Sequence, residues 1–337
     1  MIGYQTYLRW EGMGGVIQRT ILVSEAKKQL KRVIRRLLSL LRKPPPANVR
    51  KKKQEWSIGI YTGESPLNLS PHENADNPVL TCEDVSDVPA AFVADPFMLR
   101  VDSIWHMFFE VMNRQTGKGE IGLAVSSNGL EWTYRQIVLA EPFHLSYPYV
   151  FKRLGSYYMI PESYQDGSIR LYRALTFPTQ WLFVGTLLSG RTFLDSSIFY
   201  YDNKWWLFTE TNPDLKGGTL RLYCADDLVG RWYEHPESPI IEGNAHIARP
   251  AGRVLITRNR IVRYTQDCYP VYGTQVRAFE ITELTNTSYR ERELEADLIL
   301  KPSGAGWNES GMHHIDPHFT DDGQWIACVD GFFWHEV

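Results

Sequence analysis

One pattern recurs along this chain and limits what it can fold into. A buried strand opens on a polar residue, a tight turn follows, and a second strand rich in aromatic side chains ends in a carboxylate. The copies join residues 92–99 to 105–110, 147–151 to 157–162, 195–199 to 205–210, 316–319 to 325–330 and, more weakly, 248–252 to 254–256. Short apolar runs bounded by turn residues predict β-hairpins. Five copies of one hairpin predict a repeat architecture.

Two further kinds of strand follow the hairpins. Apolar runs lie at 121–125, 169–173, 220–224 and 276–280, and runs that begin with tryptophan lie at 132–134, 181–184 and 232–233. Successive copies are about fifty residues apart, which is the period of a four-stranded propeller blade. The last copy begins at Gly311 and stops after its second strand, whereas a lone strand at 56–61 precedes the first copy.

The lone strand at 56–61 supplies what the last blade lacks. If it joins that blade, the ring closes and no sheet edge is left exposed. The sequence therefore predicts an all-β fold, a five-bladed β-propeller with four-stranded blades over residues 56–337. A short helical and basic segment at 1–55 precedes it. The competing architecture is a parallel β-helix, whose rungs are shorter than this interval.

The segment at 1–55 differs in charge from the rest of the chain. It carries 14 Lys and Arg against 3 acids, although the net charge of the whole chain is −3. Aliphatic residues at helical spacing between Leu30 and Leu41 predict an amphipathic helix over 24–42. Two interpretations remain open. The apolar face packs against the propeller, or residues 24–53 lie on an anionic membrane surface, where each nearby cation contributes about 1 kcal/mol.

Charge, cysteines and the absence of targeting patterns in the sequence bear on the partners and the cellular compartment. Residues 56–337 carry 22 Lys and Arg against 36 acids, which argues against nucleic acid as a partner. The four cysteines (Cys82, Cys224, Cys268 and Cys328) are scattered, as expected for reduced thiols. The sequence shows neither a signal-peptide pattern nor an apolar run that could span a membrane. We expect a cytoplasmic protein, peripheral on the inner membrane face, without a cofactor.

The propeller fold predicts where the polar residues meet. The first strand of every blade lines the central axis, so the residues that open these strands gather at one mouth. They are Asp95, Tyr147, Asp195, Arg249 and Asp316. The second strands end in Glu110, Glu162, Glu210 and Asp330. Crowded carboxyl groups raise one another's pKa, which suits acid–base catalysis, and a pair of carboxyl groups across a sugar is the machinery of glycosidic chemistry.

The sequence Ala94-Asp95-Pro96, which opens the first blade, resembles the arabinanase and xylosidase type of five-bladed glycoside hydrolase. The resemblance implies that Asp95 is the base or nucleophile. That group has an orienting aspartate in the second blade, where this chain has Tyr147, and an acid in the third blade, which Asp195 or Glu210 would supply. The departure at Tyr147 argues against plain hydrolysis.

A second set of motifs covers about residues 56–337. It consists of Ala94-Asp95-Pro96-Phe97, Pro161-Glu162-Ser163, Arg249-Pro250-Ala251-Gly252, Arg263 with Gln266-Asp267-Cys268, Tyr272-Gly273, and Gly311-Met312-His313-His314. These motifs resemble the N-terminal domain of plant glucosamine inositolphosphorylceramide transferase and its bacterial single-domain relatives. The resemblance implies glycosyl transfer to a lipid or polysaccharide acceptor.

Three functions follow as hypotheses: an enzyme that makes or remodels a glycosidic bond, an inverting glycoside hydrolase, and a non-catalytic glycan-binding or scaffold propeller. The expected catalytic residues are Asp95, Glu162, Asp195 and Glu210. The residues expected to bind a sugar or sugar phosphate are Glu110, Tyr147, Arg249, Arg263, Gln266, Asp267, Tyr272, His313, His314 and Asp316. Within this set, Arg249 with His314 would hold an anionic group. Neighbouring histidines in a strand point to opposite faces, so at most one can join Asp316, and no metal site is predicted.

Overall fold

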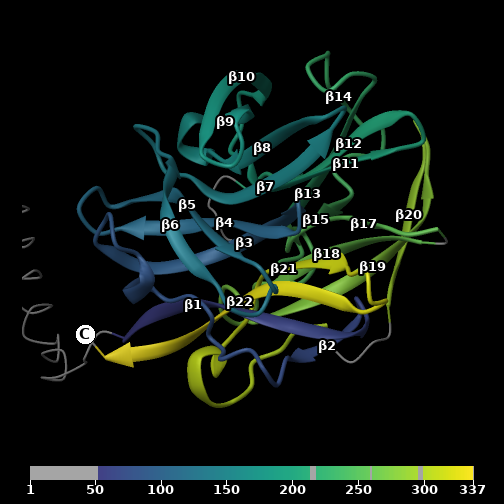
Figure 1. Ribbon diagram of the computed structural model, residues 1–337. Coiled ribbons are helices and arrows are strands. Elements are labelled where there is room, and N and C mark those ends of the chain that lie inside the picture. The colour runs from purple at the N-terminus through teal and green to yellow at the C-terminus, as the bar shows by residue number, and fades with distance from the viewer. Residues whose placement is uncertain (1–51, 213–217, 259, 295–298, 337) are drawn as a thin grey trace, which may run out of the picture. The chain divides into compact units, whose positions relative to one another are not determined.

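The structure is a computed structural model that describes residues 52–336 apart from 213–217, 259 and 295–298. This part of the chain forms five antiparallel sheets of four or five strands, which are the blades of a five-bladed propeller (Figure 1). The predicted helix at 24–42 lies outside the described residues. None of the helices within the described ranges is long and apolar enough to cross a membrane.

The blades follow one another along the chain. Blade 1 contains β3 (Ala90–Val101), β4 (Ile104–Asn113), β5 (Lys118–Ser126) and β6 (Thr133–Leu139). Blade 2 contains β7 (Ser146–Arg153), β8 (Ser156–Glu162), β9 (Ser168–Thr176) and β10 (Gln180–Ser189). Blade 3 contains β11 (Leu194–Tyr201), β12 (Lys204–Glu210), β13 (Thr219–Ala225), β14 (Tyr233–Glu234) and β15 (Ile241–Glu242).

Two blades remain. Blade 4 contains β16 (Arg249–Pro250), β17 (Leu255–Ile256), β18 (Ile261–Asp267), β19 (Gln275–Leu284) and β20 (Tyr289–Glu293). Blade 5 contains β21 (Ile315–Phe319) and β22 (Trp325–Glu336) together with β1 (Lys52–Ser65) and β2 (Asn68–Pro71). Three short 3-10 turns complete the described elements: η1 (Cys82–Asp84), η2 (Tyr164–Asp166) and η3 (Gly306–Asn308).

Blade 5 joins the two ends of the propeller, as predicted. In Figure 1 the purple β1 runs beside the yellow β22, and the register pairs Trp56 with Phe332 and Tyr61 with Ala327. The strand begins earlier than the expected residue 56, because Lys52 already pairs with Glu336. β2 adds the outermost strand of the blade. The closure of the ring therefore depends on backbone hydrogen bonds between segments at opposite ends of the sequence.

Blade 4 differs from the predicted hairpin. The runs at 248–252 and 254–256 are two pieces of the same inner strand, because β16 and β17 both pair with β18. The break lies at Gly252, where the backbone meets blade 5 and the Ile315 N–H donates to the Ala251 carbonyl at 2.8 Å. A Cβ on Gly252 would lie 1.8 Å from the Ile315 carbonyl oxygen, so the contact requires glycine.

Buried side chains fill the centre of the ring below the acidic residues. The Tyr147 hydroxyl from blade 2 lies 2.9 Å from Ser197 Oγ in blade 3 and accepts from the Gly252 N–H in blade 4 at 2.5 Å. Farther along the axis, Arg253 donates to Asp316 Oδ1 at 2.7 Å and to the Val150 carbonyl at 3.0 Å. These contacts close the axis below the acidic cluster by joining the inner strands of blades 2 to 5.

Candidate functional site

Bulges in three inner strands aim side chains at the axis. The pairing register shifts within β3, β7 and β11, and at these points Asp95, Tyr147 and Asp195 have φ of 54°, 44° and 46°. A non-glycine residue in this left-handed region costs about 1–3 kcal/mol and must be held by its surroundings. The bulges turn the polar side chains away from the regular pleat and toward one another.

Carboxylates hold the strained backbone at the bulges. The Asp95 N–H donates to Asp330 Oδ2 at 2.9 Å, and the Asp195 N–H donates to Glu162 Oε2 at 2.8 Å. In each case the acid at the end of a second strand binds the bulge of the next blade. The Tyr147 N–H is different, because it donates to Asp95 Oδ2 at 3.3 Å. Among the residues that the structure describes, this exchange leaves the corresponding acid of blade 1, Glu110, without a backbone partner.

Arg249 lies in the middle of the acids. Its Nε donates to Asp195 Oδ2 at 2.5 Å, and its terminal nitrogens lie 3.7 Å from Glu162 Oε2 and 3.7 Å from Glu210 Oε2. Gln266 Nε2 donates to the same Asp195 oxygen at 2.7 Å. Burial opposes the charge of Arg249, but the acids around it outweigh burial and raise its pKa. Three carboxyl groups therefore already surround Arg249, and its predicted role in holding an anionic substrate group stays a prediction.

The two histidines before β21 both approach Asp95. His313 Nδ1 lies 2.7 Å from Asp330 Oδ1, while its Nε2 lies 3.6 Å from Asp95 Oδ1. His314 Nδ1 lies 3.9 Å from the same Asp95 oxygen, and its ring packs edge-on against Phe97. Burial lowers the pKa of His314 to about 4. The strand alternation expected here does not apply, because β21 begins only at Ile315.

Asp316 does not occupy the place that the repeat alignment predicts. The second strands of blades 1 and 5 begin alike, with Trp105 opposite Arg100 and Trp325 opposite Phe319. Counting back from these partners brings Asp95 into correspondence with His314, and Asp316 lies deeper along the strand. Its carboxylate binds Arg253 at 2.7 Å and accepts from the Met98 N–H at 2.8 Å. Asp316 is therefore part of the closed axis and not of the acidic cluster.

Two other predicted binding residues also lie apart from the cluster. Arg263 makes a two-point ion pair with Glu291, at 2.6 and 2.7 Å. Asp267 accepts from Arg277 at 2.9 Å and lies 2.8 Å from His246 Nδ1. Both residues hold strands of blade 4 together. Their motif marks the local structure of this blade and does not place them in the acidic cluster.

Tyr272 and Tyr147 differ in their exposure beside the acidic cluster. Tyr272 is 38% exposed, and its ring lies 5.1 Å from the Arg249 guanidinium. It also packs edge-on against Trp56 and His313, with ring centroids 6.2 and 5.2 Å apart. Tyr147 is fully buried beneath the acids. Tyr272 can therefore contact a bound sugar, whereas Tyr147 forms the floor.

One residue of the cluster carries no sequence signal. His144 lies in the loop between β6 and β7, and its Nε2 is 3.5 Å from Glu110 Oε1. Its Nδ1 accepts from the Gly119 N–H at 2.9 Å. No repeat position or motif contains His144, so only the packing of the loop against blade 1 reveals it. Asp330, in contrast, was visible as a strand end but had no predicted role.

The pKa values of the acids diverge. Burial raises the pKa of Asp95 to about 7, against the opposing effect of His313. Burial, reinforced by Asp95, raises the pKa of Glu110 well above its usual range. Burial together with Asp195 does the same for Glu162. The cluster thus combines carboxyl groups whose pKa values burial and like charges raise with one whose pKa lies near neutrality, which is the combination that general acid–base chemistry needs.

A metal ion would have to compete with existing hydrogen bonds. Ligand atoms of Asp95, His313 and Asp330 lie within 4.8 Å of one another and could surround a cation. However, Asp330 Oδ1 already accepts from the His313 backbone N–H at 3.2 Å, and its Oδ2 accepts from the Asp95 N–H. Asp95 Oδ1, by contrast, is buried and has no hydrogen-bond partner among the described residues. This oxygen is an open acceptor of the cluster.

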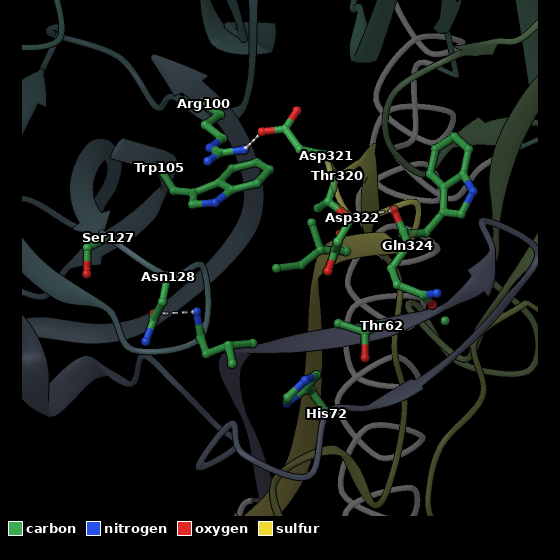
Figure 2. A pocket seen from close by; sticks show the side chains of 14 residues that line it. Thr62, His72, Arg100, Trp105, Ser127, Asn128, Thr320, Asp321, Asp322 and Gln324 are labelled. Atoms are coloured by element: carbon green, nitrogen blue, oxygen red, sulfur yellow. Dashed lines mark hydrogen bonds and ion pairs between the residues drawn. The ribbon is translucent and has the colours of Figure 1, made fainter. Parts of the chain in front are cut away.

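A cavity of about 530 Å³ lies away from the acids, at the opposite ends of the strands of blades 1 and 5. Figure 2 shows Arg100 paired with Asp321 above Trp105, with Thr62, His72 and Asn128 farther along the wall. Several of its polar groups bind within their own turns, as Asn128 Oδ1 does by accepting from the N–H groups of Leu130 and Glu131. We therefore place the chemistry at the acidic cluster.

The family described as glucosamine inositolphosphorylceramide transferase 1, N-terminal, matches residues 49–332. The chain belongs to this family. It is 36% identical over 296 residues to glucosamine inositolphosphorylceramide transferase 1 of Oryza sativa subsp. japonica, and 34% identical over 296 residues to that of Arabidopsis thaliana. Each match covers 82% of this chain but only 40% and 39% of the plant proteins.

Solved structures share the fold. A glycosyl hydrolase from Bacteroides ovatus matches with a TM-score of 0.60 at 11% identity, over 77% of this chain and 91% of that chain. The RS223 β-xylosidase matches with a TM-score of 0.53 at 14% identity, over 68% of this chain and 82% of that chain. These matches agree with the five-bladed propeller. Asp95, Arg249 and His313 lie within the residues that the family matches.

Proposed function

We propose that the propeller is a carbohydrate-active enzyme that remodels a glycosidic bond by acid–base chemistry and transfers the sugar to an acceptor hydroxyl. The observation that carries the proposal is Asp95 Oδ1, a buried acceptor with no hydrogen-bond partner among the described residues, on a carboxyl group whose pKa is raised to about 7. In this role Asp95 takes the proton from the attacking hydroxyl. A second carboxyl group gives a proton to the departing oxygen.

The charge of the cluster favours a cationic sugar. Six buried carboxyl groups surround the site: Asp95, Glu110, Glu162, Asp195, Glu210 and Asp330. Arg249 and His313 are the groups that oppose them. An ammonium group on the sugar would offset the charge of the ionised carboxyl groups and could donate hydrogen bonds to the carbonyl oxygens of the protonated ones. The plant relatives are named for glucosamine, an amino sugar, and this name supports the same class of substrate here.

The same charge disfavours a nucleotide sugar bound directly at the cluster. A diphosphate leaving group needs cations around it, and Arg249 is already engaged with three acids. A glycoside has a neutral leaving oxygen that accepts a proton as the bond breaks, which suits protonated carboxyl groups. The donor that fits best is therefore a glycoside or glycolipid carrying an amino sugar.

Hydrolysis is the second candidate, favoured by the structural likeness to glycosyl hydrolases. The two reactions differ only in the acceptor, which is water in one and a sugar or lipid hydroxyl in the other. The full-length protein is incubated with chitosan oligosaccharides and with an amino-sugar glycolipid, each with and without an alcohol acceptor. Mass spectrometry then identifies the products. We expect transfer products that Asp95→Asn abolishes.

Other outcomes decide against the proposal. Free sugar alone, formed equally with and without the acceptor, would establish hydrolysis. Turnover that requires a nucleotide sugar would contradict the glycoside donor. Binding of these oligosaccharides without turnover by wild type would support the non-catalytic propeller.

We also propose that residues 24–53 hold the protein on an anionic membrane, where a lipid acceptor would lie. The spacing of six aliphatic residues in this segment would place them on one face of a helix, with basic residues on the opposite face. The test compares the full chain with a chain that begins at Arg50, which keeps all of β1. We expect only the full chain to sediment with phosphatidylglycerol vesicles, and salt to weaken its binding. Equal binding of both chains would refute the proposal.

A further inference from the structure

We propose that Glu110 is the carboxyl group that donates the proton to the departing oxygen, and that His144 is the positioning residue that orients it. This inference rests on the proposed function, since it names the second carboxyl of the same reaction. It differs from the sequence-based pairing of Asp95 with Glu162. Three independent features of blade 1 carry it: the missing backbone partner of Glu110, the tautomer of His144, and the glycine between them.

Glu110 differs from its counterparts in blades 2, 4 and 5. Glu162 and Asp330 each accept a backbone N–H from the neighbouring bulge, and Gln266 donates to Asp195. Such a bond ties the accepting oxygen to the backbone and favours the carboxylate, although burial and Asp195 outweigh this effect on the pKa of Glu162. Glu110 Oε1 is buried and has no hydrogen-bond partner among the described residues. It is therefore free to carry and deliver a proton.

The hydrogen bonds of His144 fix its orientation. Nδ1 accepts from the Gly119 N–H at 2.9 Å, so the neutral ring carries its hydrogen on Nε2. Nε2 lies 3.5 Å from Glu110 Oε1, which is longer than a formed hydrogen bond. Burial lowers the pKa of His144 to about 4, which keeps the ring neutral. At this distance the neutral Nε2–H group does not stabilise the carboxylate strongly enough to displace the proton of Glu110. Once the proton has been transferred, the same Nε2–H group can move closer and donate a hydrogen bond to the carboxylate.

Gly119 makes room for both side chains. A Cβ at this position would lie 2.8 Å from Glu110 Oε1, 2.8 Å from His144 Cε1 and 2.2 Å from the Leu145 carbonyl oxygen. The Leu145 N–H donates to the Gly119 carbonyl at 3.0 Å, which ties the loop to blade 1. The backbone of β5 therefore sets the distance between the ring and the carboxyl group.

The step balances in protons and bonds. Glu110 starts protonated and transfers its proton to the glycosidic oxygen as the bond from that oxygen to the sugar carbon breaks. The acceptor oxygen forms the new bond to that carbon and gives its proton to Asp95. Glu110 ends as a carboxylate that accepts from His144 Nε2–H. Proton exchange through water restores both groups. The other charged or titratable groups that face Glu110 are Asp95, Glu162, Asp195 and Asp330.

The first test needs no substrate. Carboxyl ¹³C NMR of full-length protein labelled at glutamate follows the titration of Glu110, assigned with Glu110→Gln. In His144→Leu the donor is lost, so we expect the Glu110 midpoint to rise. In His144→Gln the amide N–H replaces Nε2–H, so we expect the midpoint to stay near that of wild type. Equal midpoints in wild type and His144→Leu would overturn the role of His144, whatever the activity of the protein.

The second test uses the reaction. The substrates are an amino-sugar glycoside with a poor leaving group and the 2,4-dinitrophenyl glycoside of the same sugar, whose leaving oxygen needs no proton. We expect Glu110→Gln to lower kcat/KM about 10²–10⁴-fold for the first and much less for the second. Glu162→Gln should lose the same factor on both. Equal losses on both glycosides for Glu110→Gln would overturn its role. An inactive wild type would instead refute the proposed function.

Discussion

Arg249 of blade 4 donates from Nε to Oδ2 of Asp195 in blade 3 over 2.5 Å, with both side chains buried. Because Glu162 and Glu210 also lie 3.7 Å from its terminal nitrogens, one guanidinium links acids from two neighbouring blades. The residue that sequence patterns place in a substrate-binding role is thus the internal counter-ion of the site. Its charge sets how many of the surrounding acids can be ionised.

Removal of that counter-ion should destabilise the fold. Arg249→Met leaves Asp195 buried without its cation, and breaking a buried pair in this way typically costs about 3–5 kcal/mol. Urea unfolding at pH 7 measures the loss. The loss should shrink as the pH falls and the acids become protonated. An unfolding free energy equal to that of wild type at pH 7 would show that the acids are already neutral there.

Asp95 should make the free energy of unfolding fall as the pH rises, whereas a carboxyl group with a lowered pKa makes it rise. Its pKa is raised to about 7 by burial, whereas the unfolded value is about 3.9. The folded state therefore holds the proton more tightly, and the stabilisation is complete below about pH 4 and is lost as the pH rises to 7. Asp95→Asn cannot lose a proton at this position, so its stability does not fall for this reason. The unfolding free energy of the variant minus that of wild type should therefore increase between pH 4 and pH 8. A difference that stays the same at both pH values would contradict the raised pKa of Asp95.

The activity of Asp95→Asn should fall about 10²–10⁴-fold, which is the usual contribution of a general base. In wild type, kcat/KM should rise with pH as the carboxyl loses its proton near pH 7. The measurement is the pH profile of transfer with the chitosan oligosaccharide donor. A variant that keeps its fold and turns over like wild type would place the base elsewhere in the cluster.

Asp316 should behave as a structural acid. Burial by itself would raise its pKa, but Arg253 and His318 hold it well below its usual range. Its stabilisation is therefore present above about pH 4 and is lost as the pH falls. Asp316→Asn should cost about 3–5 kcal/mol at pH 7 in urea unfolding, because Arg253 remains buried. The surviving folded protein should keep the wild-type KM for the donor, and a large rise in KM would restore the predicted binding role.

The contact between blades 4 and 5 should not tolerate a side chain. Gly252→Ala places a Cβ 1.8 Å from the Ile315 carbonyl oxygen at φ 138°, so two backbones must separate. We expect a loss of about 4 kcal/mol or more in thermal or urea unfolding. The matched control is Gly304→Ala, where φ is 76° and no atom lies within 4 Å of the added Cβ. That change should cost only about 1–2 kcal/mol, the price of the left-handed backbone. Similar losses for both would show that the blade contact is not tight.

The sequence by itself determined the architecture of the propeller. Hydrophobic periodicity and the spacing of Trp105, Trp205 and Trp325 depend on local strand geometry, so they predicted the hairpins, and the missing strands after β22 predicted its pairing with β1. The sequence also brought Asp95 and Glu162 to the right end of the strands. It did not separate His314 from Asp316, because a shift of two residues keeps a side chain on the same face of a strand and leaves the hydrophobic pattern intact.

Only the tertiary structure decided what each polar residue does. The repeats place the acids alike, but Arg249 binds Asp195, Arg253 binds Asp316 and Glu110 is left beside His144. These partners come from different blades or from a loop, and their pairing follows from distances of a few ångströms across the axis. Ionisation depends on burial and on such neighbours, which are set by packing in three dimensions. Local sequence determines where the strands form, whereas the charge of each acid depends on the neighbours that it meets in the folded propeller.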